Sequence, residues 1–125
     1  KLAWLENLLH PRIKAEILSR AQILEAKEQP FFVDIPLYFE ELDYDEFTQV
    51  ALVYAPKNLL VERVMRRNSL THDEALRRVE LQIDIEKKRE MAKFAIDNSR
   101  NLANLERETT EFIKKLKGKY DSIKV

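Results

Sequence analysis

The stretch QVALVYAPKNLLVERVMRRN (Gln49–Asn68) contains the two kinds of secondary structure that decide the fold. Its first part, residues 49–55, is a continuous apolar run of the kind that forms strands in parallel sheets covered on both faces. Pro56 follows, and proline suits the first turn of a helix. Beyond Pro56, apolar residues recur at helical spacing to about Asn68. A buried strand followed directly by a helix predicts an α/β fold.

The rest of the chain continues this alternation. Proline disfavours helical geometry in the residue before it, so His10-Pro11 is expected to separate two N-terminal helices. The sequence THDE (Thr71–Glu74) matches a capping box and predicts a helix start. The expected elements are helices over 2–9 and 11–27, strands over 31–35 and 49–55, helices over 57–68, 71–79 and 84–92, a strand over 93–98 and a helix over 101–117. Three strands would make a thin parallel sheet within layers of helices.

Composition excludes several classes of protein. The 125 residues include 22 basic and 22 acidic side chains, so the formal net charge is zero, and this argues against broad binding to nucleic acid or to an anionic membrane. No apolar run approaches the roughly 20 residues needed to span a bilayer. The absence of cysteine excludes disulfides and thiolate metal sites and fits a reducing cytoplasm. We therefore expect a cytoplasmic protein that binds neither nucleic acid nor membrane.

Glycine usage restricts nucleotide chemistry. The sequence contains one glycine, Gly118, close to its C-terminal end. A phosphate-cradling loop needs glycines so that backbone N–H groups can approach the phosphates. Any nucleotide chemistry would therefore need parts that these 125 residues do not supply. The sequence begins at Lys1 without a methionine, so a processed or truncated piece is expected.

The stretch FFVDIP (31–36) places a carboxylate, Asp34, within an expected buried strand. An apolar strand that ends in Asp is a recurring device in phosphoryl-transfer enzymes, where the carboxylate holds Mg²⁺ directly or through water. Ligands bind at this carboxyl edge of open α/β sheets. The alternative is that Asp34 bonds neighbouring backbone and only shapes the loop that Pro36 begins. The pattern leaves both interpretations open.

A basic cluster lies on the helix after Pro56. Arg63 and Arg67 are four residues apart, so they share a helical face, and Arg66 lies beside them. Paired guanidinium groups suit phosphate oxygens because their fork geometry allows bidentate contacts. The alternative is a solvated helix face whose charge is balanced by nearby acidic residues.

Two further positions have more than one interpretation. His10 precedes a proline that starts a helix, where a cap or a packed side chain is more usual than a catalytic base. With two histidines and no cysteine, a zinc site is not expected. The stretch AIDNS (95–99) is either a turn and N-cap before the last helix or one wall of a nucleotide site.

Taken in order, four segments resemble dephospho-coenzyme A kinases over the C-terminal two-thirds of that family. The segments are WLENLLHPRIKAEI (4–17), VDIPLYFE (33–40), VALVYAPKNLLVERVMRRNSLTHDEALRRVELQ (50–82) and AKFAIDNSRNLANL (92–105). The most telling parts are HPRI, DIPLYFE and AIDNS. The resemblance extends from about Trp4 to Leu116.

This resemblance implies a three-layer P-loop NTPase fold with a parallel sheet and a helical lid. It also implies transfer of the γ-phosphate of ATP to the ribose 3′-hydroxyl of dephospho-coenzyme A, the last step of coenzyme A biosynthesis, with Mg²⁺. The lid would comprise about residues 63–92. The implied partners are ATP and dephospho-coenzyme A.

The resemblance also assigns residues. Arg67 matches the lid arginine of the family and Arg63 a second basic position, so both are expected to act on the ATP phosphates. Asn98 would lie near the adenine of ATP. The substrate side would contain His10, Asp34, Pro36, Leu37 and Glu40, and Asp34 would hold Mg²⁺ indirectly. Tyr38 stands where leucine is common in the family, and Asn68-Ser69 stand where Asp or Asn and Gly are frequent.

One part of the family pattern is not found in the sequence. The family begins with a glycine-rich phosphate loop on the central strand, followed by an acidic residue after the second strand. We therefore interpret residues 1–125 as a C-terminal fragment of one P-loop kinase domain that lacks the P-loop strand. The three expected strands would flank that central strand. The fragment alone is expected to be inactive and to self-associate through exposed strand edges.

Two other functions remain compatible with the residues. The first is another P-loop kinase that acts on a nucleoside or nucleotide. The second is a non-enzymatic, mostly helical binding module whose charged helices dock a partner, which would need no phosphate loop.

Overall fold

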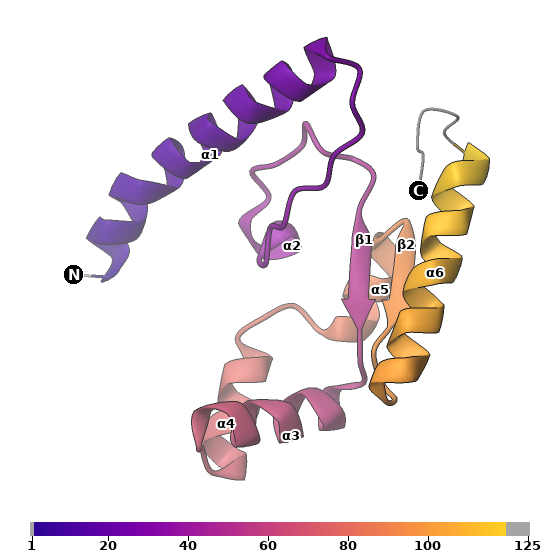
Figure 1. The fold of residues 1–125 in the computed structure, drawn as a ribbon. Coiled ribbons are helices and arrows are strands. Elements are labelled where there is room, and N and C mark those ends of the chain that lie inside the picture. The colour runs from indigo at the N-terminus through magenta and orange to yellow at the C-terminus, as the bar shows by residue number, and fades with distance from the viewer. Residues whose placement is uncertain (1, 120–125) are drawn as a thin grey trace. The chain divides into compact units, whose positions relative to one another are not determined.

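The computed structural model describes residues 2–119 and divides the chain into two compact units, with the boundary between Pro36 and Leu37. Each unit is described by itself. The first contains a single long helix, α1 (Leu2–Ala26), followed by an irregular segment (Figure 1). The second, Leu37–Lys119, contains the sheet and the other helices.

Helix α1 runs without interruption through His10 and Pro11, so the expected division into two helices is wrong. Proline has no N–H, and the carbonyl of Asn7, four residues earlier, therefore has no backbone donor at this turn. Asn7 and its neighbours are exposed, so water can take the place of that donor. The loss stays within one turn because the sequence on both sides favours helix.

The expected strand over 31–35 is also wrong, because these residues form an irregular segment. Asp34 is exposed, so no charge is buried here, and Phe32 is 72% exposed. A strand needs a neighbour that accepts and donates its backbone hydrogen bonds. Among residues 2–119, the two strands that form pair with each other.

The sheet consists of β1 (Ala51–Tyr54) and β2 (Phe94–Asp97), which pair in parallel. The register joins Ala51 to Phe94 and Tyr54 to Asp97, so both strands end at the same edge. Three helices form the crossover between them, as a parallel pair requires. The expected parallel orientation is confirmed, whereas β1 and β2 do not flank a central strand as expected, because they are hydrogen-bonded directly to each other.

Four helices of the second unit match the expected ones closely, and one short helix, α2 (Tyr38–Glu41), was not expected. Helix α3 has the expected limits, and the C-terminal helix extends two residues further than expected. Their bounds are α2 (Tyr38–Glu41), α3 (Lys57–Asn68), α4 (His72–Glu80), α5 (Ile85–Met91) and α6 (Leu102–Lys119). No helix among residues 2–119 is long and apolar enough to cross a bilayer.

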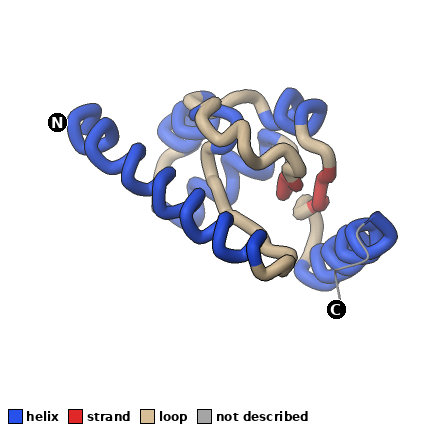
Figure 2. Tube along the Cα trace, turned by 90° about the horizontal axis from the view of Figure 1, so that it is seen from above, coloured by secondary structure: helices blue, strands red, loops and turns tan. Residues whose placement is uncertain are grey.

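Helix α6 packs on β2, and α5 packs on β1. The rings of Phe94 and Phe112 meet edge to face with centroids 5.5 Å apart, and Ile96 of β2 and Phe112 and Leu116 of α6 are buried. Figures 1 and 2 both show α6 alongside the strand pair. This packing holds the carboxyl ends of both strands in place.

Candidate functional site

The carboxyl edge of the sheet is polar. Tyr54 and Asp97 are the last residues of their strands and are register partners. The Asn98 N–H donates to the Tyr54 carbonyl at 2.7 Å, so the chain beyond β2 stays beside the end of β1. The Ser99 N–H donates to Asp97 Oδ1 at 2.9 Å. Ligands of open α/β folds bind at such an edge.

Asp97 favours its ionised form. A hydrogen bond from the Ser99 side chain lowers the pKa of Asp97 below its ordinary value of 3.8, and the Ser99 N–H, Arg100 and Arg89 add to this. Partial burial acts in the opposite direction but is outweighed. Sequence reasoning had selected Asn98 here and not Asp97. The signal that could have found Asp97 is its place as the last residue of an apolar strand.

Helix α5 adds two charged side chains, Glu86 and Arg89, to this edge through their contacts with Tyr54. The Tyr54 hydroxyl donates to the Glu86 carboxylate, and the Arg89 guanidinium lies 4.5 Å from the centroid of the Tyr54 ring. The bond to Glu86 and some desolvation raise the pKa of Tyr54 above its ordinary value of 10.0. Sequence reasoning missed all three residues, because their meeting depends on how α5 packs against β1.

The two candidate arginines lie on α3, as expected. Arg63 is half-buried and Arg67 is exposed. Arg67 Nε donates to the Asn68 side-chain oxygen at 3.0 Å, while Arg66 forms an ion pair with Glu62. An exposed guanidinium one turn from a second arginine is suited to bind phosphate oxygens.

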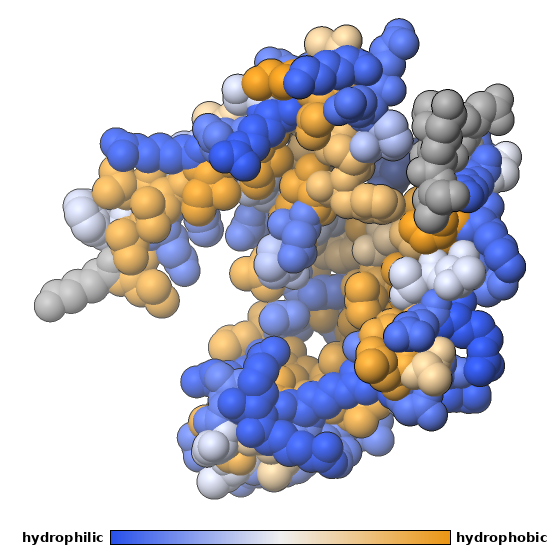
Figure 3. Space-filling view, viewed as in Figure 1, coloured by the Kyte–Doolittle hydropathy of each residue, from blue (hydrophilic) through white to orange (hydrophobic). Residues whose placement is uncertain are grey.

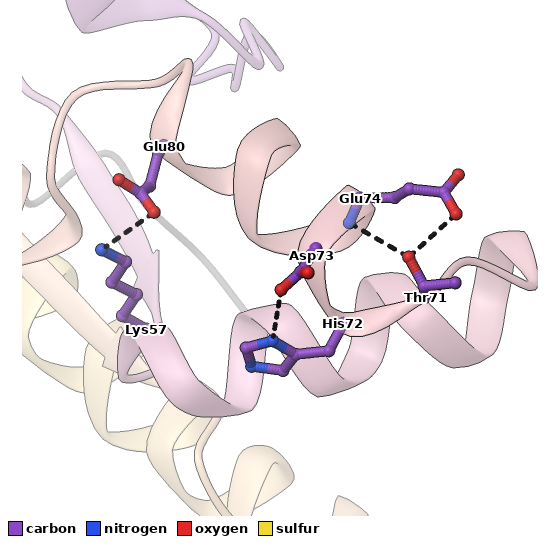
Figure 4. A network of polar contacts seen from close by, with 6 residues as sticks. All are labelled: Lys57, Thr71, His72, Asp73, Glu74 and Glu80. Atoms are coloured by element: carbon purple, nitrogen blue, oxygen red, sulfur yellow. Dashed lines mark hydrogen bonds and ion pairs between the residues drawn. The ribbon is translucent and has the colours of Figure 1, made fainter.

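The helix that bears these arginines is held against α4 (Figure 4). Glu74 N–H donates to Thr71 Oγ1 at 3.3 Å, and the Thr71 hydroxyl donates to the Glu74 carboxylate at 2.8 Å, so the expected cap is confirmed. Lys57 Nζ lies 3.8 Å from Glu80 Oε1, joining the start of α3 to the end of α4. Ser69 ends α3 in the left-handed region, with φ 53°.

Glu40, an expected substrate-side residue, bonds within the protein. Its Oε2 lies 2.5 Å from Lys88 Nζ and accepts from the Ile83 N–H at 2.9 Å. Burial of the Glu40 carboxyl raises its pKa, but the bonds from Lys88 and Ile83 outweigh burial, so the pKa lies below its ordinary 4.5. Lys88 was not predicted. Its signal is weak, a lysine three residues after the half-buried Ile85 on the same helix face.

A cavity adjoins this ion pair. Its volume is about 250 Å³, and its lining includes Lys57, Leu60, Gln82, Ile83 and Lys88. The residues come from α3, from the junction of α4 and α5, and from α5 itself. The cavity is therefore formed by the same crossover helices that position Arg63 and Arg67.

The remaining predicted residues are all exposed. His10 lies in α1, and Asp34 and Pro36 lie in the irregular segment of the first unit. Leu37 begins the second unit and is 37% exposed. Among residues 2–119, no three His, Asp or Glu side chains converge as a metal-binding group would. The structure thus brings Asn98 to the sheet edge and Arg63 and Arg67 together on α3.

The chain is an α/β protein in which two parallel strands are joined by a helical crossover. Polar groups gather at the carboxyl ends of these strands, which is where open α/β sheets bind ligands. The sequence model of one family, CoaE, dephospho-CoA kinase, matches residues 1–104. The chain belongs to the dephospho-CoA kinase family. The family was expected from the sequence, and that prediction is confirmed.

Individual relatives agree with this assignment. The chain is 46% identical over 116 residues to the dephospho-CoA kinase of Sulfurimonas denitrificans, which covers 93% of this chain. It superposes on the structure of dephospho-CoA kinase from Campylobacter jejuni with a TM-score of 0.62 and 38% identity over 90% of this chain. It superposes on TT1252 from Thermus thermophilus with a TM-score of 0.71 and 33% identity over 92% of this chain.

The matches cover little more than half of these relatives. The chain spans 58% of the Sulfurimonas protein, 55% of the Campylobacter chain and 59% of the Thermus chain. The activity of a whole protein therefore does not follow from family membership alone.

Proposed function

We propose that the full polypeptide, meaning this chain with any residues its gene encodes before Lys1, is an ATP-dependent dephospho-CoA kinase. It transfers the γ-phosphate of ATP to the ribose 3′-hydroxyl of dephospho-coenzyme A. The observation that carries the proposal is the family match over residues 1–104. The helical crossover supports the proposal, because its helix α3 presents the exposed Arg67 one turn from Arg63.

The lid arginines have an electrostatic role in this proposal. Phosphoryl transfer depends on positioning and on stabilising charge along the transferred group. Arg67 neutralises charge that develops between the phosphates, and Arg63 supports it from the same helix face. Asn98, at the polar sheet edge, lies toward the adenine. Pro36, Leu37 and His10 are assigned to the acceptor side.

The family implies Mg²⁺. This ion keeps several waters and binds through one or two carboxylates together with substrate phosphates. Asp34 is an exposed carboxylate of the donor type that Mg²⁺ prefers, so it fits a role in holding a metal-bound water. When bound, the ion supplies charge stabilisation to the phosphates. Asp34 itself orients water and needs no burial for this role.

Residues 1–125 alone are proposed to be inactive. The single glycine, Gly118, leaves no stretch able to cradle phosphates with backbone N–H groups. Without a fixed phosphate, Arg67 has nothing to act on. Robust turnover by the isolated polypeptide would contradict this.

The test is ATP-dependent phosphorylation of dephospho-coenzyme A by the full polypeptide, with adenosine and AMP as competing acceptors. Arg67→Ala is expected to lower kcat by about 10³-fold, within the range of arginine contacts in other phosphoryl-transfer enzymes. Arg107→Ala, an exposed arginine on α6, is the matched control and should retain full activity. Preference for adenosine or AMP would indicate another P-loop kinase. Failure of the folded protein to bind ATP would indicate a binding module.

A further inference from the structure

Glu40 and Lys88 form an ion pair that is largely withdrawn from water. Their side chains are 17% and 7% exposed. The pair lies within the second unit and joins α2 to α5. By contrast, the side chains of the ion pair of Glu111 and Lys114 on α6 are 57% and 68% exposed.

Several groups of the second unit complete this arrangement. Lys88 Nζ also donates to Gln82 Oε1 at 3.3 Å, and the Ile83 N–H donates to Glu40. The second carboxylate oxygen of Glu40 is buried and has no hydrogen-bond partner among residues 2–119. Burying charges is costly unless they are paired and bonded. A pair with one unsatisfied oxygen is therefore an expensive way to join two segments if stability is its only role.

The two joined segments have different proposed tasks. Glu40 lies in α2, directly after Pro36 and Leu37 on the acceptor side. Gln82 and Ile83 lie at the junction of α4 and α5, and Lys88 lies in α5, all within the lid of residues 63–92. The pair thus connects α2, on the acceptor side, to the C-terminal end of the lid. Arg67 lies near the N-terminal end of the lid.

The arginine-bearing helix has its own attachments. Lys57 joins α3 to Glu80 of α4, and Thr71 caps α4 immediately after α3 ends. These contacts, drawn in Figure 4, involve neither Glu40 nor Lys88. Loss of the buried pair should therefore loosen α2 and leave Arg63 and Arg67 in place on α3.

We propose that Glu40 and Lys88 are positioning residues that hold α2, and with it the adjoining acceptor-side Leu37, against the lid. This inference rests on the proposed function and deepens it. Glu40 acts through the placement of its neighbours and does not itself contact the acceptor. Its substrate-side role, expected from the sequence, is then indirect.

The test uses steady-state kinetics of the full polypeptide with Glu40→Gln, Lys88→Met and the double variant. All are assayed at a temperature where each is folded by circular dichroism. The single variants are expected to raise the KM for dephospho-coenzyme A at least tenfold, with the KM for ATP changed less than threefold. Glu111→Gln removes the same charge from an exposed pair and should leave both constants unchanged.

The double variant separates positioning from simple stability. Each single variant leaves one buried charge without its partner, which destabilises, whereas the double variant leaves neither. We expect its thermal stability to recover toward that of the wild type while the acceptor KM remains raised. Recovery of the acceptor KM together with stability would overturn the proposal. The proposal would also be overturned if the folded single variants lowered kcat and left both KM values unchanged.

The two proposals fail differently. If the wild-type polypeptide does not phosphorylate dephospho-coenzyme A, the proposed function fails. If the wild type is active and the acceptor KM of folded Glu40→Gln equals that of the wild type, the positioning role alone fails.

Discussion

Tyr54 and Asp97 are register partners at the carboxyl ends of two parallel strands, although 42 other residues separate them in the sequence. This pairing brings the Asn98 N–H to the Tyr54 carbonyl and collects polar groups at one edge of the sheet. Helix α5 adds Glu86 and Arg89 to the same edge through Tyr54. The polar edge is thus a product of strand register and of helix packing together.

The lowered pKa of Asp97 predicts a pH dependence of stability. A carboxyl group whose pKa is lower in the folded than in the unfolded state stabilises the fold above its unfolded value, and this stabilisation is lost as the pH falls through the folded pKa. Asp97→Asn keeps an oxygen that can accept from Ser99 but cannot titrate. We expect wild type to lose stability more steeply than the variant below about pH 3.8, the ordinary value of this group.

Urea denaturation of the full polypeptide from pH 6 to pH 2.5 measures this difference. Asp73→Asn, whose carboxylate is 92% exposed, is the control and should follow the wild-type curve. Parallel curves for wild type and Asp97→Asn would contradict the ionised state that we assign to Asp97.

The elements that could be predicted from the sequence are those that local residues determine. The limits of α3 follow from Pro56 and from helical periodicity, and the start of α4 follows from the Thr71 cap. The strands expected over 49–55 and 93–98 form at those places but are shorter than expected. These features depend on hydrogen bonds and side-chain spacing within a few residues.

The errors concern interactions that the local sequence does not contain. Residues 31–35 have a strand-like composition, yet a strand also needs a neighbour, and none of the described strands pairs with them. The helix break expected at Pro11 does not occur. The carbonyl of Asn7, which loses its backbone donor there, is exposed, so water can replace that hydrogen bond. Lys88 was missed because its partner, Glu40, is brought to it only by the folded crossover.

Ser69→Gly should stabilise the protein. Ser69 has φ 53° and ψ 47°, and the left-handed region costs a residue with a Cβ roughly 1–2 kcal/mol. Glycine avoids this cost but loses roughly 0.5–1 kcal/mol more chain entropy on folding. We expect a net gain of about 0.5 kcal/mol in the free energy of unfolding, measured by urea denaturation.

Ser69→Ala is the matched variant, because alanine keeps the Cβ and should give no gain. If glycine and alanine had the same effect at this position, the left-handed conformation of Ser69 would not be the source of the strain.

Thr71→Ala should weaken the start of α4. The Thr71 hydroxyl oxygen accepts from Glu74 N–H, and loss of such an N-cap costs about 1 kcal/mol. Thr110 is also an exposed threonine, but it lies inside α6 and its hydroxyl donates to the Glu106 carbonyl. Thr110→Ala should therefore change the free energy of unfolding by less than about 0.5 kcal/mol. Equal losses at the two sites would contradict the capping role.

The isolated polypeptide of residues 1–125 should self-associate. Large apolar side chains are exposed in both units, among them Trp4 at 69% and Val53 at 56%, and Figure 3 shows apolar residues exposed along α1. Each strand of the two-stranded sheet also has one edge without a strand partner among residues 2–119. Exposed strand edges and apolar patches promote pairing between chains.

Sedimentation equilibrium over a range of concentrations measures this association. We expect the weight-average mass to rise above the monomer mass with concentration, and Val53→Lys to reduce the rise because it places a charge on the exposed side of β1. Leu102→Lys, at an apolar position on α6 that is 70% exposed and outside the strands, is the control and should associate like the wild type. A mass that stays at the monomer value throughout would show that the exposed edges of β1 and β2 do not drive association.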